Sequence, residues 1–150
     1  IGISNSETGL AALSVTTYFL RLICSNGLIS TNGVTESYRH VSTRVLQEFP
    51  QVIQNVSNNL HKHQDRFRIS AECPVENPES TIRTFNKNFQ LGQKEIEAVN
   101  WAFPQEVQED RANMFQIVQA YTRAADFPSL SAESSFKLQK TGGDILSLVA

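Results

Sequence analysis

The chain has little of what builds disulfide-stabilised, secreted or membrane-spanning proteins. Its 150 residues include two cysteines, five prolines and one tryptophan. No apolar run approaches the roughly 18 residues that a membrane span requires, and no basic-then-apolar leader is visible at the start. We therefore expect a cytoplasmic protein without a membrane partner. Because the first residue is Ile1 and not Met, we also expect a piece of a longer chain.

Two cysteines leave few options for a disulfide. Cys24 and Cys73 could pair, but two thiols in a chain without a leader are more commonly reduced and buried. The sequence also lacks a phosphate-cradling glycine loop, a Gly-x-Ser-x-Gly elbow and a dinucleotide fingerprint. These absences favour a protein without a cofactor, and a non-catalytic role over an enzymatic one.

What is present is a globular composition with an uneven distribution of charge. Hydrophobic residues make up 40% of the chain and charged residues 19%, which fits one domain with one core. Residues 1–70 carry six Lys or Arg against four Asp or Glu, whereas residues 71–150 carry seven against eleven. A basic first part and an acidic second part indicate different partners for the two halves.

The first third shows the patterns of short strands. Residues 10–24 alternate imperfectly between two faces, as a strand buried on both sides does, and this predicts a strand over 10–15. Two alternatives stay open for 17–25: a strand, or a short helix that a threonine caps and that ends at Gly27.

Two turn signals follow. Asn-Gly pairs at 26–27 and 32–33 predict turns, and residues 34–41 predict a further extended segment. The first third is therefore predicted to form a small hairpin-rich sheet.

From residue 43 the apolar period changes to that of a helix. The apolar stripe recurs every three or four positions through Leu46, Phe49, Ile53, Val56, Leu60, His63 and Phe67. This spacing predicts a long amphipathic helix. Pro50 lies inside the stripe and predicts a kink, or a break after which Pro50 starts a second piece.

The second half is predicted to be helical. Residues 71–80, an acidic segment with two prolines, form the predicted hinge between the halves. Three helices are predicted after it, at 79–90, 93–103 and 106–125. Pro104 and Pro128 are predicted breaks, and Ser131 is the predicted N-cap of a last helix that Gly142-Gly143 interrupts.

The predicted fold class is α+β, with a small hairpin-rich antiparallel sheet in the first third and helices in the remainder. A single domain is expected over residues 1–150, with the sheet and the long helix in 1–70 and the helical half in 80–150. The helices are predicted to contribute two groups of core residues, with aromatic stacking platforms as the alternative: Trp101 with Val99 and Phe103 nearby, and Phe115 with Val118 and Tyr121.

Three polar motifs lie within or beside the predicted strands of the first third. Residues 5–9 read NSETG, residues 21–28 read RLICSNGL, and Arg39-His40 ends the predicted extended segment. This succession resembles an uncharacterised family of phage- and plasmid-associated proteins, in which an Asn-Ser-x-x-Gly turn precedes an Arg-x-x-Cys-x-Asn-Gly-Leu block and an Arg-His pair. Residues 114–125 (MFQIVQAYTRAA) are similar to the family's helix with an Ala-x-Thr signature.

The resemblance implies a phage or plasmid setting and involvement with mobile DNA, and it implies no reaction. One departure matters for chemistry. Many members carry His-Asp in the first turn, where this chain has Glu7-Thr8. A mechanism that needs an imidazole in that turn is therefore not expected here.

Each motif has a structural interpretation beside a functional one. Asn5, Ser6 and Gly9 suit a turn that satisfies its own backbone, but Asn5 and Glu7 would share a face at a strand end and could hold a ligand. Arg21 lies in an apolar run, where its guanidinium needs water, a carboxylate such as Glu7, or a phosphate.

Arg39 and His40 lead into a helix whose outer face is partly basic. That face offers Arg44, Asn55, Asn59, Lys62 and Arg66. Mixed with the aromatic residues Tyr18, Tyr38 and Phe67, these side chains are ingredients of a surface for single-stranded nucleic acid. The alternative is a solvated helix face, which is the simpler interpretation of Lys62, Arg66 and Arg68.

A metal site is not expected. His61 and His63 are two positions apart, about 200° around a helix, whereas zinc ligands on a helix usually stand four apart.

Three functions from different classes remain. The first is a non-catalytic module for single-stranded nucleic acid that uses one site in the first half, made of Asn5, Glu7, Arg21, Asn26, Arg39 and His40. The second is an interaction protein whose acidic helical half docks a host or phage protein. The third is a hydrolase that pairs Glu7 or Ser6 with His40. Oligomeric state stays open.

Overall fold

The computed structural model describes residues 60–108 and 111–149, the helical residues 50–51, 53–55 and 57–58, and five strands before residue 39. For those five strands the description covers the backbone alone. Everything said below about side chains concerns residues from Pro50 onward.

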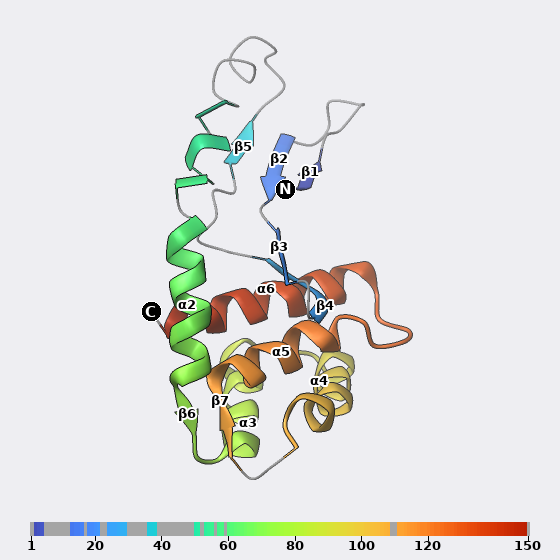
Figure 1. The fold of residues 1–150 in the computed structure, drawn as a ribbon. Coiled ribbons are helices and arrows are strands. Elements are labelled where there is room, and N and C mark those ends of the chain that lie inside the picture. The colour runs from blue at the N-terminus through green and yellow to red at the C-terminus, as the bar shows by residue number, and fades with distance from the viewer. Residues whose placement is uncertain are drawn as a thin grey trace.

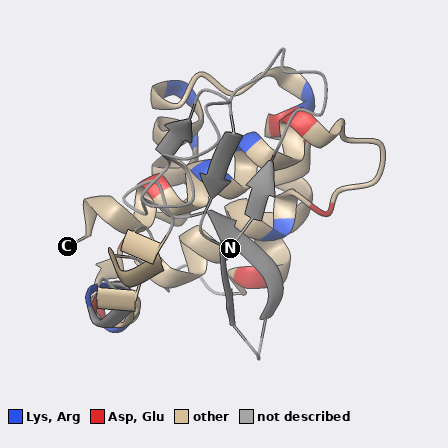
Figure 2. Ribbon diagram, turned by 90° about the horizontal axis from the view of Figure 1, so that it is seen from above, with Lys and Arg blue, Asp and Glu red and all other residues tan. Residues whose placement is uncertain are grey.

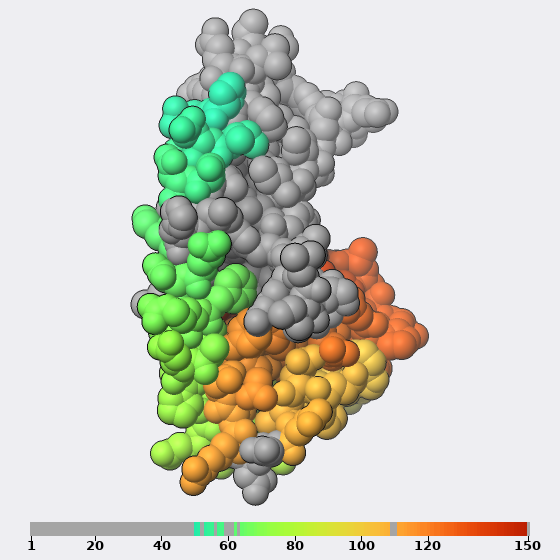
Figure 3. Space-filling model, in the orientation of Figure 1, coloured from blue at the N-terminus to red at the C-terminus, as the bar shows by residue number. Residues whose placement is uncertain are grey.

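Five helices form the packed body of the protein (Figure 1). They are α2 (Leu60–Glu72), α3 (Pro78–Asn88), α4 (Gln93–Glu106), α5 (Met114–Ala124) and α6 (Ala132–Leu148). A two-stranded antiparallel ribbon, β6 (Pro74–Val75) with β7 (Ala112–Asn113), joins the end of α2 to the start of α5. The space-filling view shows α2, α5 and α4 as one continuous surface (Figure 3).

Helix α5 is the centre of this body, in contact with α2, α4 and α6. Seven of its eleven residues are buried, among them Ile117, Val118, Tyr121 and Ala124 with no exposed surface. A helix that is apolar on most of its circumference has to be covered on all sides, and here the other helices cover it. The prediction that Val118 and Tyr121 are core residues is confirmed.

Two other core predictions fare differently. Trp101 on α4 is 38% exposed, so its prediction as a core residue is wrong. Its ring lies 5.6 Å from that of Phe127, which covers one part of the indole. Phe115 is half-buried and packs edge-to-face against Phe67 of α2, with ring centroids 6.0 Å apart.

Polar caps fix where three of the helices begin. Asn77 accepts a hydrogen bond from the Ser80 N–H at 3.0 Å, and Pro78 supplies the first residue of α3. Asn113 and Gln116 form a reciprocal capping box at α5. The predicted cap at Ser131 is confirmed, because its Oγ accepts the Ser134 N–H at 3.1 Å.

The predicted helix breaks are partly wrong. Pro104 lies in the last turn of α4, and the helix continues for two more residues to Glu106. Gly142 and Gly143 are buried within an uninterrupted α6, where small residues let the helix lie close to its neighbours. The helix predicted at 106–125 begins only at Met114, because β7 precedes it.

The segment predicted as a hinge is tied to the body. Val75 pairs with Ala112 in the ribbon, and the Met114 N–H donates to the Cys73 carbonyl oxygen at 2.9 Å. Pro78 is buried at the start of α3. Residues 71–80 therefore form a strand and a helix start instead of a free connector.

The predicted α+β class is wrong for the packed body. Helices contain 76% of the residues whose side-chain surroundings are described, and the sheet of the body is the two-stranded ribbon after residue 73, not a sheet in the first third. The helical residues from Pro50 onward, which include α2, agree with the predicted amphipathic helix. Residues 43–49 of that predicted helix lie outside the described residues. The body's core comes from helix faces that meet each other, which no strand pattern in the first third could indicate.

The backbone of the first third forms short strands in two separate sets. β1 (Gly2–Ser4), β2 (Leu13–Thr16) and β5 (Glu36–Tyr38) pair in the order β1-β2-β5, and β3 (Tyr18–Arg21) pairs with β4 (Cys24–Ile29), all antiparallel. They do not form the single sheet on which the predicted class rested. Asn26-Gly27 lies inside β4, so the turn predicted there is wrong, and β4 lies against α5 and α6.

Candidate functional site

Most of the site residues predicted from the sequence lie outside the described residues. These are Asn5, Ser6, Glu7, Arg39 and His40. Arg21 ends β3, and Asn26 lies in β4, its antiparallel partner. The register pairs Leu20 with Gly27 but Arg21 with Cys24, so Arg21 and Asn26 both lie at the irregular end of this strand pair. A common site for the six residues other than Ser6 stays a prediction.

The predicted nucleic-acid surface loses one aromatic residue. Phe67 packs against Phe115 in the body and is not free to stack on a base. On the same helix Lys62 is exposed, and Arg68 forms an exposed ion pair with Glu72 at 3.4 Å. A solvated helix face accounts for both of these cations.

A buried carboxylate joins α4 to α6. Glu95 is 8% exposed, and its Oε2 accepts hydrogen bonds from the Gly92 N–H at 2.7 Å and from Lys137 Nζ at 2.9 Å. Ser134 donates to Oε1 at 3.1 Å. Burial by itself raises the pKa of Glu95, but these hydrogen bonds and the Lys137 charge outweigh burial and hold the pKa below its usual value.

A buried phenol joins α5 to α3. The Tyr121 hydroxyl donates to Asn86 Oδ1 at 2.7 Å and lies 3.2 Å from the Ile82 carbonyl oxygen. Burial raises the pKa of Tyr121 well above its usual value, because the phenolate has no water around it. Phe85 packs edge-to-face against the same ring.

A third polar cluster joins the end of α4 to α5. Arg123 Nε donates to Glu106 Oε1, and Arg123 Nη1 donates to Gln105 Oε1 at 3.3 Å. Gln116 Nε2 donates to the Glu106 backbone oxygen at 3.1 Å. In all three clusters the polar groups bind other parts of the body, so we assign them to folding and not to catalysis.

The negative charge of the second half is concentrated at one end. Among the described residues, 72–79, 105–108 and 111 carry four Asp or Glu and one Arg, whereas 80–104 and 112–149 carry five Asp or Glu and six Lys or Arg. The β6–β7 pairing brings the two acidic segments together, although they are far apart in sequence. We call them the acidic end.

The rest of the body shows no such separation of charge. Seen from above, the Lys and Arg segments and the Asp and Glu segments of the described helices are intermingled (Figure 2).

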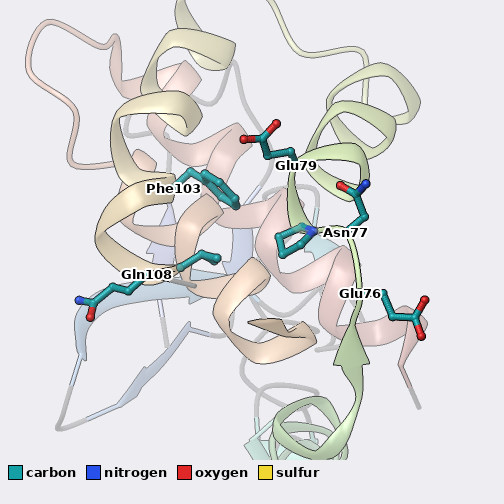
Figure 4. Close-up of a pocket in the computed structure, with 7 residues that line it drawn as sticks. Glu76, Asn77, Glu79, Phe103 and Gln108 are labelled. Atoms are coloured by element: carbon teal, nitrogen blue, oxygen red, sulfur yellow. The ribbon is translucent and has the colours of Figure 1, made fainter. Parts of the chain in front are cut away.

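A groove of about 410 Å³ opens at the acidic end, between the start of α3 and the end of α4. Its lining consists of Glu76, Asn77, Pro78, Glu79, Phe103, Val107 and Gln108. The Phe103 ring points into the space between the two helices, whereas Glu76 and Gln108 extend outward from its rim (Figure 4). Two further hollows adjoin it, one of about 220 Å³ that also contains Arg83 and one of about 500 Å³ that contains Arg111.

The carboxylates of the acidic end differ in their availability. Glu106 is turned inward to Arg123, and Glu72 pairs with Arg68. Glu79 pairs with Arg83 at 3.4 Å, but both side chains are largely exposed. Glu76 is exposed and makes no ion pair within the described part of the chain. The groove is therefore flanked by two carboxylates that an incoming cation can reach.

The part of the chain that the structure describes has neither a metal-ligand cluster nor a membrane-spanning helix. Among the described residues, no group of three or more His, Cys, Asp or Glu is placed to hold a metal ion. None of the described helices is long and apolar enough to cross a bilayer. Cys73 is a free, half-buried thiol.

Sequence reasoning missed Glu76, Glu79 and Phe103 as members of one surface. The acidic segment around Glu76 was visible, but its prolines favoured a hinge. Phe103 looked like a core residue of its helix. Only the β6–β7 pairing shows that the two segments face each other.

Comparison with known protein families, with curated proteins and with solved structures found no match to this chain.

Proposed function

We propose that this chain is a non-catalytic interaction module that docks a partner protein through its acidic end. The supporting observation is the concentration of acidic side chains there: outside the acidic end, the described residues of the second half carry one more cation than anions. The exposed carboxylates of Glu76 and Glu79 attract and orient a partner of the opposite charge. The partner surface is therefore basic.

The groove supports a binding role at the same place. Specific recognition combines an apolar contact that excludes water with polar groups that fix orientation. Phe103 and Val107 supply the apolar part, and Glu76 and Glu79 supply the charges. Nucleic acid is disfavoured as the ligand of this end, because carboxylates repel phosphates.

Single-stranded nucleic acid stays a prediction for the first half, on the six residues named from the sequence. Its test is fluorescence anisotropy with labelled oligonucleotides over a salt series, with micromolar affinity that weakens with salt as the expected result. The kinship with phage- and plasmid-associated proteins also stays a prediction, and it makes a host or phage protein the partner to look for. The hydrolase alternative has its residues outside the described part and gains no support.

Co-purification with matched charge reversals tests the docking proposal. The tagged full chain is compared with a Glu76→Lys/Glu79→Lys variant and with a Glu97→Lys/Glu133→Lys control. Glu79 and Glu133 each occupy the second position of a helix, and Glu76 and Glu97 are both exposed. The two variants therefore have the same net charge and similar helix-dipole penalties.

The expected result is a protein that the wild type and the control recover from a lysate of the natural host, and that the acidic-end variant does not. Quantitative mass spectrometry measures the difference. Equal recovery by all three proteins, or no recovered partner, would count against the proposal.

A further inference from the structure

The groove at the acidic end differs in chemistry between its floor and its rim. Phe103 is half-buried and Val107 is 7% exposed, so the floor that they form is apolar. Glu76 and Glu79 are exposed on the α3 side. A ligand that fits both parts carries aliphatic groups on one face and cations at its edges.

The size of the groove limits the form of that ligand. A volume of about 410 Å³ is at the lower end of the pockets that hold small ligands, about 300–1,000 Å³. A helix, with side chains about 10–12 Å across, is too thick for it. An extended strand fits better, because every second side chain points to the floor and the long, flexible cationic side chains between them can bend to the rim.

We propose, building on the docking function above, that this groove seats an extended segment of the partner in which lysine or arginine alternates with an aliphatic residue. The aliphatic side chains lie on Phe103 and Val107. The flanking cations lie beside Glu76 and Glu79.

The carboxylates are free enough to accept those cations. The Glu79–Arg83 pair joins neighbouring turns of α3, with side chains 72% and 80% exposed, and exposed pairs of this kind contribute little stability. An incoming cation can therefore compete with Arg83 for Glu79. Glu76 has no ion pair in the described part of the chain that a ligand would have to break.

Cations at the two ends of the groove restrict the ligand further. Arg83 lines the hollow on the side of α3 and α4, and Arg111 lines the hollow beside the ribbon. A basic segment longer than the groove meets these like charges. The site is thus expected to prefer a short basic-aliphatic segment over a long polycation.

Binding of defined peptides to the full chain tests this inference. The probe is a fluorescein-labelled peptide of sequence Gly-Lys-Leu-Lys-Leu-Lys-Gly, and its comparison peptides carry serine for both leucines or glutamate for the three lysines. The protein variants are Glu76→Gln/Glu79→Gln, Phe103→Ala and the control Glu97→Gln/Glu133→Gln. Anisotropy at low salt gives each dissociation constant.

The expected result is at least a tenfold loss of affinity for the serine peptide, roughly what burial of one leucine side chain contributes. Neutralising Glu76 and Glu79 causes a similar loss, the control variant binds like the wild type, and the glutamate peptide does not bind. Phe103→Ala weakens the binding of the leucine peptide but does not change the affinity for the serine peptide. The reason is that Phe103→Ala in the protein and the leucine-to-serine change in the peptide remove the same contact. If Phe103→Ala unfolds the chain, comparing the leucine and serine peptides on the wild-type protein still shows whether the aliphatic side chains contribute to binding.

Equal affinity for the leucine and serine peptides, or for the wild type and the Glu76→Gln/Glu79→Gln variant, would overturn the groove assignment. The docking function would survive the first of these outcomes if the partner from the lysate still depended on Glu76 and Glu79. If recovery of the partner from the lysate did not depend on Glu76 and Glu79 while peptide binding did, the docking function alone would be overturned.

Discussion

The carboxylate of Glu95 on α4 and the ammonium of Lys137 on α6 lie 2.9 Å apart, with the Glu95 side chain 10% exposed and the Lys137 side chain 41% exposed. Lys137 also donates to the Gln90 backbone oxygen at 3.0 Å. One lysine thus holds together the loop after α3, the start of α4 and the start of α6. Stability of the helical body is expected to depend on the charge of Glu95.

Glu95→Gln is expected to lower the free energy of unfolding at pH 7 by about 1.5–3 kcal/mol, the range for hydrogen bonds to charged groups. The folded-state pKa of Glu95 is depressed, so its contribution is present above the unfolded pKa of about 4.5 and is lost as pH falls through the folded value. The difference between wild type and variant should shrink from pH 7 toward pH 3. Urea denaturation at each pH measures it, and Glu97→Gln is the exposed control. A difference that does not change with pH would contradict the assignment.

Tyr121→Phe is expected to destabilise the fold by about 1–3 kcal/mol, because Asn86 Oδ1 is left buried without its donor. The raised pKa of Tyr121 gives a second measurement. Absorbance at 295 nm should rise equally in wild type and variant up to about pH 10, the ordinary range for tyrosine, since Tyr121 stays protonated there. A wild-type curve with one additional tyrosine titrating near pH 10 would show that the phenol reaches water in the folded protein.

Gln90→Gly is expected to stabilise the protein. Gln90 has a positive φ of 51°, and α3 ends in a Schellman arrangement, with Leu91 N–H bonded to the Asn86 oxygen and Gln90 N–H to the Lys87 oxygen. Left-handed backbone costs a residue with a side chain roughly 1 kcal/mol, and glycine avoids this cost. Thermal unfolding measures the gain. Lys87→Gly, inside the same helix, should instead lower the melting temperature.

Replacing either of two glutamines of α5 by methionine should change the stability of the fold, in opposite directions for the two positions. Gln119 is 6% exposed, and its Oε1 has no hydrogen-bond partner among the described residues. Gln119→Met removes that buried acceptor and is expected to raise the free energy of unfolding by about 1–3 kcal/mol. Gln116→Met removes the hydrogen bond from the Asn113 N–H to Gln116 Oε1, which is one half of the capping box, and the bond to the Glu106 oxygen, and should lower the free energy of unfolding by about 1–2 kcal/mol. Chemical denaturation of the two variants side by side measures both, and a loss of stability in Gln119→Met would contradict the assignment.

The helices of the second half were largely visible in the sequence, because their signals are local. The cap at Ser131 was predicted from one polar residue before an apolar period, and α3 and α4 begin within a residue of the predicted starts. Helix breaks were predicted at Pro104 and Gly142, but α4 and α6 continue through these residues. The effect of a proline or glycine on a helix depends on its position in the helix and on its packing. Pro104 falls in a last turn, and Gly142 lies against neighbouring elements in a buried stretch.

The composition and order of residues by themselves determined that this chain forms amphipathic helices after residue 50 and that its second half is acidic. Periodicity and capping act over a few residues, so they can be read without a fold. Tertiary structure alone decided that Val75 pairs with Ala112, that the two acidic segments meet, and that Phe103 faces Glu79 across a groove. Such contacts join residues about 25 to 40 positions apart, and the packing around α5 selects them from many pairings that the same pattern allows.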